Sequence, residues 1–405
     1  MKRGLILLVI FTTVLFSPRV SSQDTNWVKE NTWYFNNFVK DILSWEVFRE
    51  TYIGVAPAPS GDFDQIFYNA LFKDQLAAKG HCYGMDVMAM LMKKNGGHLG
   101  YCHPPYVYSG DFNDPAVDTT GPDDMNLKTA LQMTHGIQIN HQFLMFLLDI
   151  IAIGKNRDGR YTLQQVNYYL AKNDPPVISV TKGISPADGG HVIIPYFTAN
   201  LGATSRIYVY DPNRSFYKAG PDGVDYYKSR VNYIEINNTT GAWKFTMIGS
   251  LGVWNGDPGS GGNCIAIPLS TAGKKDRLPQ SLLADGSYAL NTIFIYGNVK
   301  VQQVSDLTGQ KHLYNDAGTD YEPCAENRLT TVMPYIPMDY QPESSGDKKD
   351  NQMFNFRGTD PVKINFKAWG DYKVGMIFHG HYYEVSGKGK GELINFQPLA
   401  ENMKK

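Results

Sequence analysis

A cysteine, a histidine and an aspartate stand along this chain in an order that suits a thiol nucleophile. Cys82 follows Gly80 and opens a run with apolar residues at helical spacing, so we expect it at the start of a helix. His191 begins an apolar strand pattern, and Asp211 ends the next one. A thiol attacks a carbonyl only as the thiolate, which a helix N-terminus and a nearby imidazolium both stabilise. The three residues together predict acyl transfer through a cysteine.

Each of these residues also has an ordinary structural explanation when it is considered alone. A single cysteine is most often a buried structural residue, a histidine can be a core or turn residue, and Asp-Pro-Asn is a common turn signal. A hairpin between the two strands, however, would set Asp211 beside His191. The carboxylate would then bond one ring nitrogen and aim the other at the sulfur of Cys82. Asn213 is the alternative third member.

Three short segments resemble the papain-like cysteine peptidases, and most closely the bacterial branch that includes the double-glycine leader peptidases. These segments are Gly80-His81-Cys82-Tyr83-Gly84-Met85, Gly189-Gly190-His191-Val192-Ile193 and Val209-Tyr210-Asp211-Pro212-Asn213. The resemblance implies that Cys82 is the nucleophile, His191 the general base and acid, and Asp211 the residue that orients the ring. Asn213 stays open because papain itself uses an asparagine in that role.

The sequence departs from the resembled family at the oxyanion hole. The family has a glutamine shortly before its cysteine, but Leu76 occupies that position here, and Gln75 is its neighbour. A one-residue insertion in the turn 77–80 would realign Gln75, and the backbone N–H of Cys82 would be the second donor. Because losing one such donor costs about 10²–10³ in rate, a missing glutamine would indicate a slow or inactive enzyme.

The N-terminus has the pattern of an export signal. Lys2 and Arg3 precede an apolar stretch over 5–16, and small residues lead up to a cleavage site before Gln23. We therefore expect residues 1–22 to be a signal peptide. The apolar stretch is short for a membrane span, and no later segment is long and apolar enough for one. The sequence predicts a secreted, periplasmic or cell-surface protein.

The amino-acid composition narrows the classes of protein to which this chain could belong. The chain has 405 residues, with 42% apolar and 19% charged residues, which is typical of a folded globular protein. Its net charge of −1 and the absence of a dense basic cluster argue against a nucleic-acid partner. The four cysteines lack the spacing of a zinc site, and we expect no metal or other cofactor. If Cys82 stays free, at most one disulfide can join two of Cys102, Cys264 and Cys324.

Hydrophobic periodicity changes within residues 61–272. Helices are expected first, over 63–78, 82–94, 127–153 (as one helix or a pair) and 162–171 with Thr162 as its cap. Strands follow, over 177–180, 191–196, 206–210, 233–236 and 243–245. This order predicts an α+β papain-like domain, with the cysteine on a helical half and the histidine and aspartate on an antiparallel sheet half.

The two flanking regions have different patterns. Residues 23–60 are rich in aromatic residues. Two interpretations remain for them: a packed N-terminal segment, or an inhibitory pro-region of the kind that peptidases of the resembled family often carry. Residues 280–405 contain short strand patterns separated by glycine, aspartate and serine turns, which predict an all-β, sandwich-like accessory domain. Strands are expected over 292–296, 299–304, 362–366, 372–378 and 382–385.

The sequence thus predicts an exported cysteine peptidase that acts on protein or peptide substrates. Cys82 would attack a peptide carbonyl, His191 would protonate the leaving amine, and water would resolve the thioester. Two alternatives stay open. One is an amidase or acyltransferase of similar mechanism that acts on cell-wall peptides. The other is an inactive papain-like binding protein, whose C-terminal domain holds a glycan or a cell-surface partner.

Overall fold

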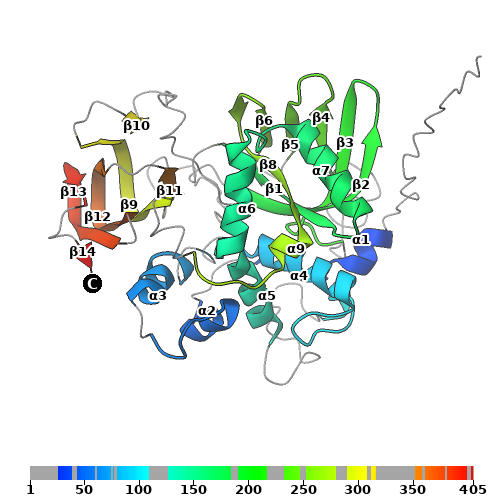
Figure 1. Ribbon diagram of the computed structural model, residues 1–405, viewed down its shortest axis with the longest axis horizontal. Coiled ribbons are helices and arrows are strands. Elements are labelled where there is room, and N and C mark those ends of the chain that lie inside the picture. Colours follow the sequence, from blue (N-terminus) through cyan, green and yellow to red (C-terminus); the bar gives the residue numbers. More distant parts are fainter. Residues whose placement is uncertain are drawn as a thin grey trace, which may run out of the picture.

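The computed structural model describes fifteen parts of the chain. They are residues 26–38, 43–59, 62–73, 76, 80–108, 126–183, 190–216, 232–246, 252–279, 290–307, 312–315, 352–357, 361–378, 381–398 and 403–404. The expected signal peptide (1–22), Gln75 and Cys324 lie outside these residues. Within them, helices come first along the chain and strands follow (Figure 1).

The helical elements precede the sheet, apart from one short helix near residue 270. They are α1 (Asn26–Asn31), α2 (Trp45–Thr51), α3 (Asp62–Phe67), the π-helical turn η1 (Tyr68–Phe72), α4 (Cys82–Asn95), the 3-10 turn η2 (Pro105–Val107), α5 (Leu127–Gly136), the 3-10 turn η4 (Ile137–Ile139), α6 (His141–Ala152), α7 (Gly159–Ala171) and α9 (Leu269–Ala272). The region 127–153 is a helix pair because the backbone of Asn140 is extended and interrupts the helix. The side chain of Asn140 then caps α6 by accepting a hydrogen bond from the N–H of Phe143.

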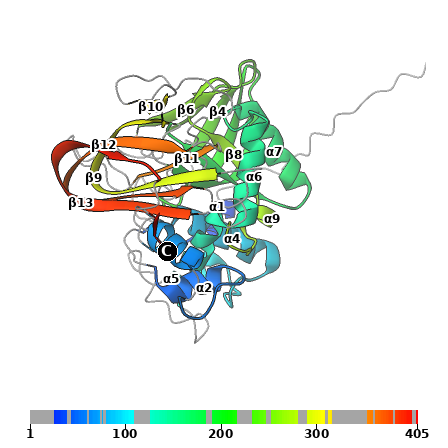
Figure 2. The same ribbon diagram turned by 60° about the vertical axis from the view of Figure 1, so that its left-hand side comes forward.

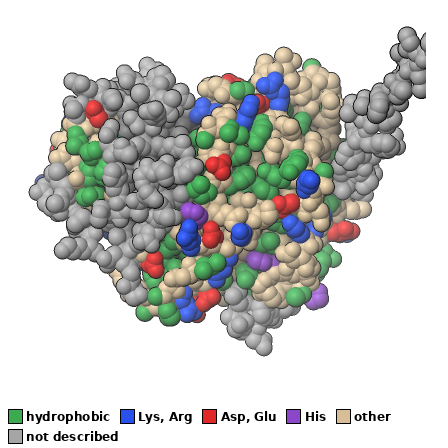
Figure 3. Space-filling model, in the orientation of Figure 1, with side chains coloured by type: hydrophobic (Ala, Val, Ile, Leu, Met, Phe, Trp, Pro, Cys, Tyr) green, Lys and Arg blue, Asp and Glu red, His purple; other side chains and the backbone are tan. Residues whose placement is uncertain are grey.

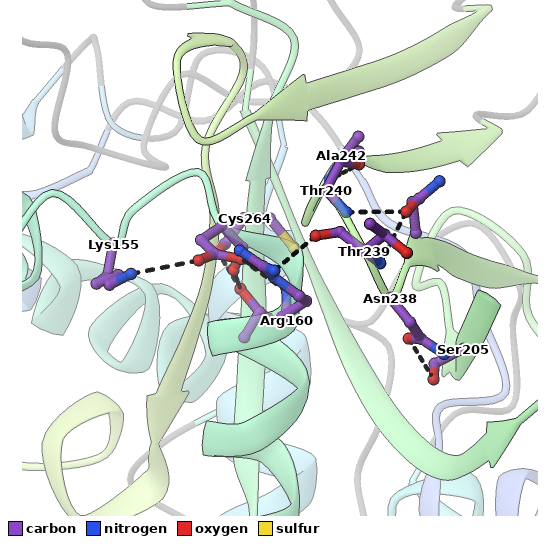
Figure 4. Close-up of polar contacts among 11 residues, drawn as sticks. Lys155, Arg160, Ser205, Asn238, Thr239, Thr240, Ala242 and Cys264 are labelled. Atoms are coloured by element: carbon purple, nitrogen blue, oxygen red, sulfur yellow. Dashed lines mark hydrogen bonds and ion pairs between the residues drawn. The ribbon is translucent and has the colours of Figure 1, made fainter. Parts of the chain in front are cut away.

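Asp158, rather than Thr162, caps α7. The Asp158 carboxylate accepts a hydrogen bond from the N–H of Arg160 at 3.1 Å and pairs with the Arg160 guanidinium. Thr162 lies inside the helix instead, and its hydroxyl donates to the carbonyl oxygen of Cys264. Arg160 also donates to the carbonyl oxygen of Thr239, so the start of α7 is joined to the β4–β5 hairpin (Figure 4). The expectation of a Thr162 cap is therefore wrong.

Eight described strands form one sheet in the order β7-β6-β5-β4-β3-β2-β1-β8, and all neighbours are antiparallel. Their bounds are β1 (Pro176–Thr181), β2 (Gly190–Asn200), β3 (Thr204–Tyr210), β4 (Tyr233–Asn237), β5 (Trp243–Thr246), β6 (Val253–Asp257), β7 (Ser260–Gly261) and β8 (Cys264–Pro268). The predicted mixture of helices and antiparallel sheet is confirmed.

Both faces of this sheet are covered by helices. Val177 of β1 and Val192 of β2 belong to the hydrophobic core that contains α4 and α5. Their sequence neighbours Ile178 and Ile193 belong to a second core with Val166 of α7. Successive residues of a strand point to opposite faces, so α4 and α7 pack on opposite sides of the sheet (Figure 1). This arrangement explains why every residue of β1 is buried.

The described strands after residue 290 form a second sheet, which is strongly curled (Figure 2). Its strands are β9 (Leu290–Asp306), β10 (His312–Asn315), β11 (Gln352–Arg357), β12 (Val362–Phe378), β13 (His381–Phe396) and β14 (Met403–Lys404). Two pairs of expected short strands are instead single long strands, β9 and β12. Gly370, at φ +77°, lies where the β9–β12 pairing shifts register. All described strands here belong to one sheet, so the second sheet of the expected sandwich is not among them.

The visible surface is mixed in character. In the view of Figure 3, hydrophobic side chains gather on the part of the molecule where α6 and α7 lie. Ile153, at the end of α6, is 57% exposed and Tyr168 of α7 is 53% exposed.

Among the described helices, none has the length and apolar character that a bilayer crossing needs.

Candidate active site

The helix α4 begins at Cys82, as the sequence predicts. Gly80 takes a positive φ of +138°, the side chain of the N-cap residue His81 makes no capping bond, and the N–H of Gly84 in the first turn donates to Nδ1 of His135 at 3.3 Å. The partial positive charge at this helix N-terminus favours a negative charge on the sulfur of Cys82. The helix approaches α5 closely at Gly84, where an added Cβ would lie 2.3 Å from the carbonyl oxygen of Leu131. The absence of a side chain at Gly84 thus allows α4 to pack closely on α5 and keeps Cys82 buried.

Neighbouring strands bring His191 and Asp211 together. His191 is the second residue of β2, and Asp211 directly follows β3, whose last residue pairs with Ile194 of β2. The Nε2 atom of His191 donates to Oδ1 of Asp211 at 2.8 Å, and neither side chain is exposed. The same carboxylate oxygen accepts the N–H of Asn213 at 2.9 Å. The carboxylate is therefore held by two donors and fixes the plane of the ring.

The charge state of His191 follows from its surroundings. Burial alone would lower the pKa of the ring, but the charge and hydrogen bond of Asp211, together with Cys82, raise that pKa to about 10. The ring is an imidazolium at neutral pH. Nε2 is bonded to Asp211, and Nδ1 has no hydrogen-bond partner among the residues that the structure describes. Cys82 is nevertheless close enough to act on the ring, and such contacts often tighten only when substrate binds.

A second carboxyl group, Asp86, lies one helical turn after Cys82 on α4. Its side chain is fully buried, and neither oxygen has a hydrogen-bond partner among the described residues. Burial raises the pKa of Asp86 well above its usual range; His191 opposes this shift, whereas Cys82 and Asp211 add to it. The protein surroundings of Asp86 therefore favour the protonated, neutral form of its carboxyl group. A charged residue inside an apolar, methionine-rich run was the available sequence signal for it.

Asn213 contributes its backbone N–H to the group, not its side chain. The amide oxygen of Asn213 accepts a hydrogen bond from Asn37, and Asp211 occupies the place beside the imidazole. Gln75 lies outside the described residues. Its neighbour Leu76 is fully buried, and its carbonyl oxygen lies 2.8 Å from Nε2 of His135. The backbone N–H of Cys82 remains available as an oxyanion donor.

The other described cysteines lie apart from this chemistry. Cys82, Cys102 and Cys264 are all free thiols. Cys264 is fully buried at the start of β8, and burial raises the pKa of its thiol to about 12. Cys102 is exposed. Among the described residues, no group of three or more histidine, cysteine, aspartate or glutamate side chains could hold a metal ion.

The reacting groups are enclosed in this conformation. The side chains of Cys82, His191 and Asp211 are each 0% exposed. A molecule from the solvent can therefore reach the sulfur of Cys82 only after neighbouring residues move. Comparisons with family models, with curated proteins and with solved structures find no match for this chain. The argument for a function consequently rests on the geometry and charges of this site.

Proposed function

We propose that the protein is an exported cysteine peptidase with a papain-like domain, in which Cys82, His191 and Asp211 form the catalytic triad. The observation that carries the proposal is the buried 2.8 Å contact between His191 and Asp211, coupled to a thiol at the first residue of a helix. A helix terminus and an imidazolium are the two features that stabilise a thiolate.

The reaction proceeds through a thioester. The Cys82 thiolate adds to the peptide carbonyl, and the N–H groups at the start of α4 stabilise the oxyanion. The imidazolium of His191 gives its proton to the leaving amine nitrogen as the C–N bond breaks. Neutral His191 then takes a proton from water, the resulting hydroxide attacks the thioester, and the acid product leaves as the Cys82 thiolate and the imidazolium are restored. Asp211 holds the ring throughout.

Two other outcomes are separated from this proposal by experiment. An amidase or acyltransferase acting on cell-wall peptides would use the same residues on a different substrate. A binding protein without activity would keep the fold, and the complete burial of Cys82 is the observation that favours it. In that case the C-terminal sheet would hold a glycan or a cell-surface partner.

The test uses the two other described thiols as internal references. The full-length secreted protein is treated with iodoacetamide at mildly acidic pH, and alkylation of each cysteine is followed by mass spectrometry. We expect Cys82 to react faster than the exposed Cys102, and Cys264 not to react. A Cys82 rate no higher than that of Cys264, which is equally buried, overturns the proposed thiolate.

Cleavage is tested separately, with a peptide library and with purified peptidoglycan. We expect hydrolysis of peptides by the wild-type protein and none by Cys82→Ala. Release of fragments from peptidoglycan alone would identify the cell-wall enzyme. Fast alkylation of Cys82 without cleavage of either substrate would identify the binding protein.

A further inference from the structure

We propose that residues 26–38 are a permanent part of the active-site framework, and that Asn37 is a positioning residue that ties the cysteine helix to the histidine–aspartate half. This inference rests on the proposed function, because it assigns a role to a segment that could equally have been a removable pro-region. It is carried by the contacts of this segment with both sides of the site.

Asn37 contacts the residues on either side of the catalytic group. Its Oδ1 accepts the N–H of His81, the residue before the nucleophile, at 2.7 Å. Its Nδ2 donates to Oδ1 of Asn213 at 2.9 Å, and its backbone N–H donates to the carbonyl oxygen of Pro212 at 2.7 Å. One side chain thus joins the start of α4 to the turn after β3, although the two are far apart in the sequence.

These contacts complete a closed ring through the triad. Asn213 donates its N–H to Oδ1 of Asp211, the same oxygen that accepts Nε2 of His191. Cys82 acts on the pKa of the His191 ring, and Cys82 directly follows His81, whose N–H donates to Asn37. Every link other than the Cys82–His191 contact is a hydrogen bond of 2.7–2.9 Å. Asn37 therefore fixes the separation of the two halves that must meet.

The space around Asn37 is also closely fitted. A Cβ added to Gly80 would lie 2.7 Å from Nδ2 of Asn37, so a glycine is required where the chain enters α4. The ring of Phe38 stacks on that of His81 at 4.3 Å between centroids. The segment thus contacts the backbone and the side chain directly before Cys82.

The rest of the segment is anchored in the core. The Trp33 side chain is fully buried, and its Nε1 donates to the carbonyl oxygen of Met85 on α4 at 2.8 Å. Asn36 accepts the N–H of Ser215, whose hydroxyl lies within hydrogen-bond distance of the carbonyl oxygens of Trp33 and Tyr34. Truncating a buried large aromatic residue destabilises a protein, because it loses buried apolar surface and leaves a cavity. Removing the whole segment would open the core beneath α4.

The first experiment measures whether Asn37 positions the thiolate or only adds stability. In Asn37→Ala, we expect the ratio of Cys82 to Cys102 alkylation at mildly acidic pH to fall about tenfold, and kcat to fall more than KM changes. Asn37→Asp keeps an acceptor for His81 but cannot donate to Asn213, so its effect should be intermediate. Either variant can be used if the other folds poorly.

The matched control is Asn238→Ala in the β4–β5 hairpin. Asn238 accepts a hydrogen bond from Ser205 at 2.8 Å (Figure 4) and donates one to the carbonyl oxygen of Gly202 at 2.7 Å, so its loss also removes two side-chain hydrogen bonds. We expect the alkylation ratio of this variant to equal that of the wild type. A fall in melting temperature with an unchanged ratio in the Asn37 variants overturns the positioning role.

The second experiment determines the N-terminus of the active, secreted protein. We expect it to begin at or before Asn26. An active form that begins after Phe38 overturns the proposal. The two proposals fail separately: cleavage by the wild type with no effect of Asn37 substitution refutes only the positioning role. Fast Cys82 alkylation that depends on Asn37, without any cleavage, refutes only the peptidase.

Discussion

The imidazole of His191 and the carboxylate of Asp211 meet at 2.8 Å, and protein surrounds both completely. His191 lies on β2 and Asp211 directly follows the adjacent antiparallel strand β3, so backbone pairing sets the geometry of the pair. An imidazolium buried without a counter-ion would lose its proton, because burial disfavours the charged form. Asp211 reverses that tendency.

We predict that Asp211→Asn lowers kcat by about 10²-fold or more, because the neutral amide no longer stabilises the imidazolium or selects its orientation. The measurement is steady-state hydrolysis of the best library peptide. Asp174→Asn is the matched control. Like Asp211, Asp174 accepts hydrogen bonds from two other residues, but these are Lys94 and Ser270, which lie outside the triad. Equal activity of the two variants would contradict the role of Asp211.

The alkaline decline in the pH profile of kcat/KM should occur only at high pH. The pKa of His191 is raised from about 6.5 to about 10, so the imidazolium that protonates the leaving amine persists through the neutral range. We expect kcat/KM to decline only as the pH approaches 10. In Asp211→Asn the residual activity should decline at lower pH. An alkaline limb at the same pH in both proteins would show that a different group controls it.

The elements of the site were predictable because their signals are local. The helix from Cys82, the strand that carries His191 and the strand that ends before Asp211 all follow from hydrophobic periodicity. The contact between the last two also follows, since consecutive strands usually pair. The Asp158 cap was missed because Thr162 with Gln165 fits a capping pattern equally well.

Contacts between distant segments were not predictable. Asn37 meets His81 and Asn213 only because the tertiary fold brings three separate turns together, and no periodicity marks an asparagine for that role. The C-terminal strands were divided too finely for a related reason. A bulge at Gly370 resembles a turn in the sequence, although the strand continues through it.

Asp86→Asn should stabilise the protein at neutral pH. The folded state holds the Asp86 proton above the usual pKa of 3.8, so this group favours folding fully only below that value. As pH rises, the unfolded carboxyl ionises and the wild type loses up to about 1.4 kcal/mol per pH unit until the folded carboxyl also ionises. The neutral amide has no such loss. Urea unfolding at several pH values measures the difference.

The control for Asp86 is Asp158→Asn, for which the opposite sign is expected. Burial would raise the pKa of Asp158, but hydrogen bonds and charge from Arg160 and Lys155 lower it overall. Its stabilising contribution is present at neutral pH and is lost as pH falls through the folded pKa. Asp158→Asn should therefore be less stable than the wild type at neutral pH, and this difference in unfolding free energy should shrink in acid. The higher stability of Asp86→Asn should also vanish in acid. A pH-independent gap for Asp86→Asn would show that its carboxyl is not held protonated.

Gly84→Ala should destabilise the helical half and displace the nucleophile. The new Cβ would lie 2.3 Å from the backbone oxygen of Leu131, which cannot move alone because it belongs to α5. Overpacking of this kind costs about 1–3 kcal/mol, and α4 must shift away from α5, which also lowers the Cys82 alkylation rate. Gly259→Ala is the control, since its Cβ would meet only the end of the Asp257 side chain. Calorimetry and alkylation of both variants test the prediction, and unchanged values for Gly84→Ala would show that the two helices separate without cost.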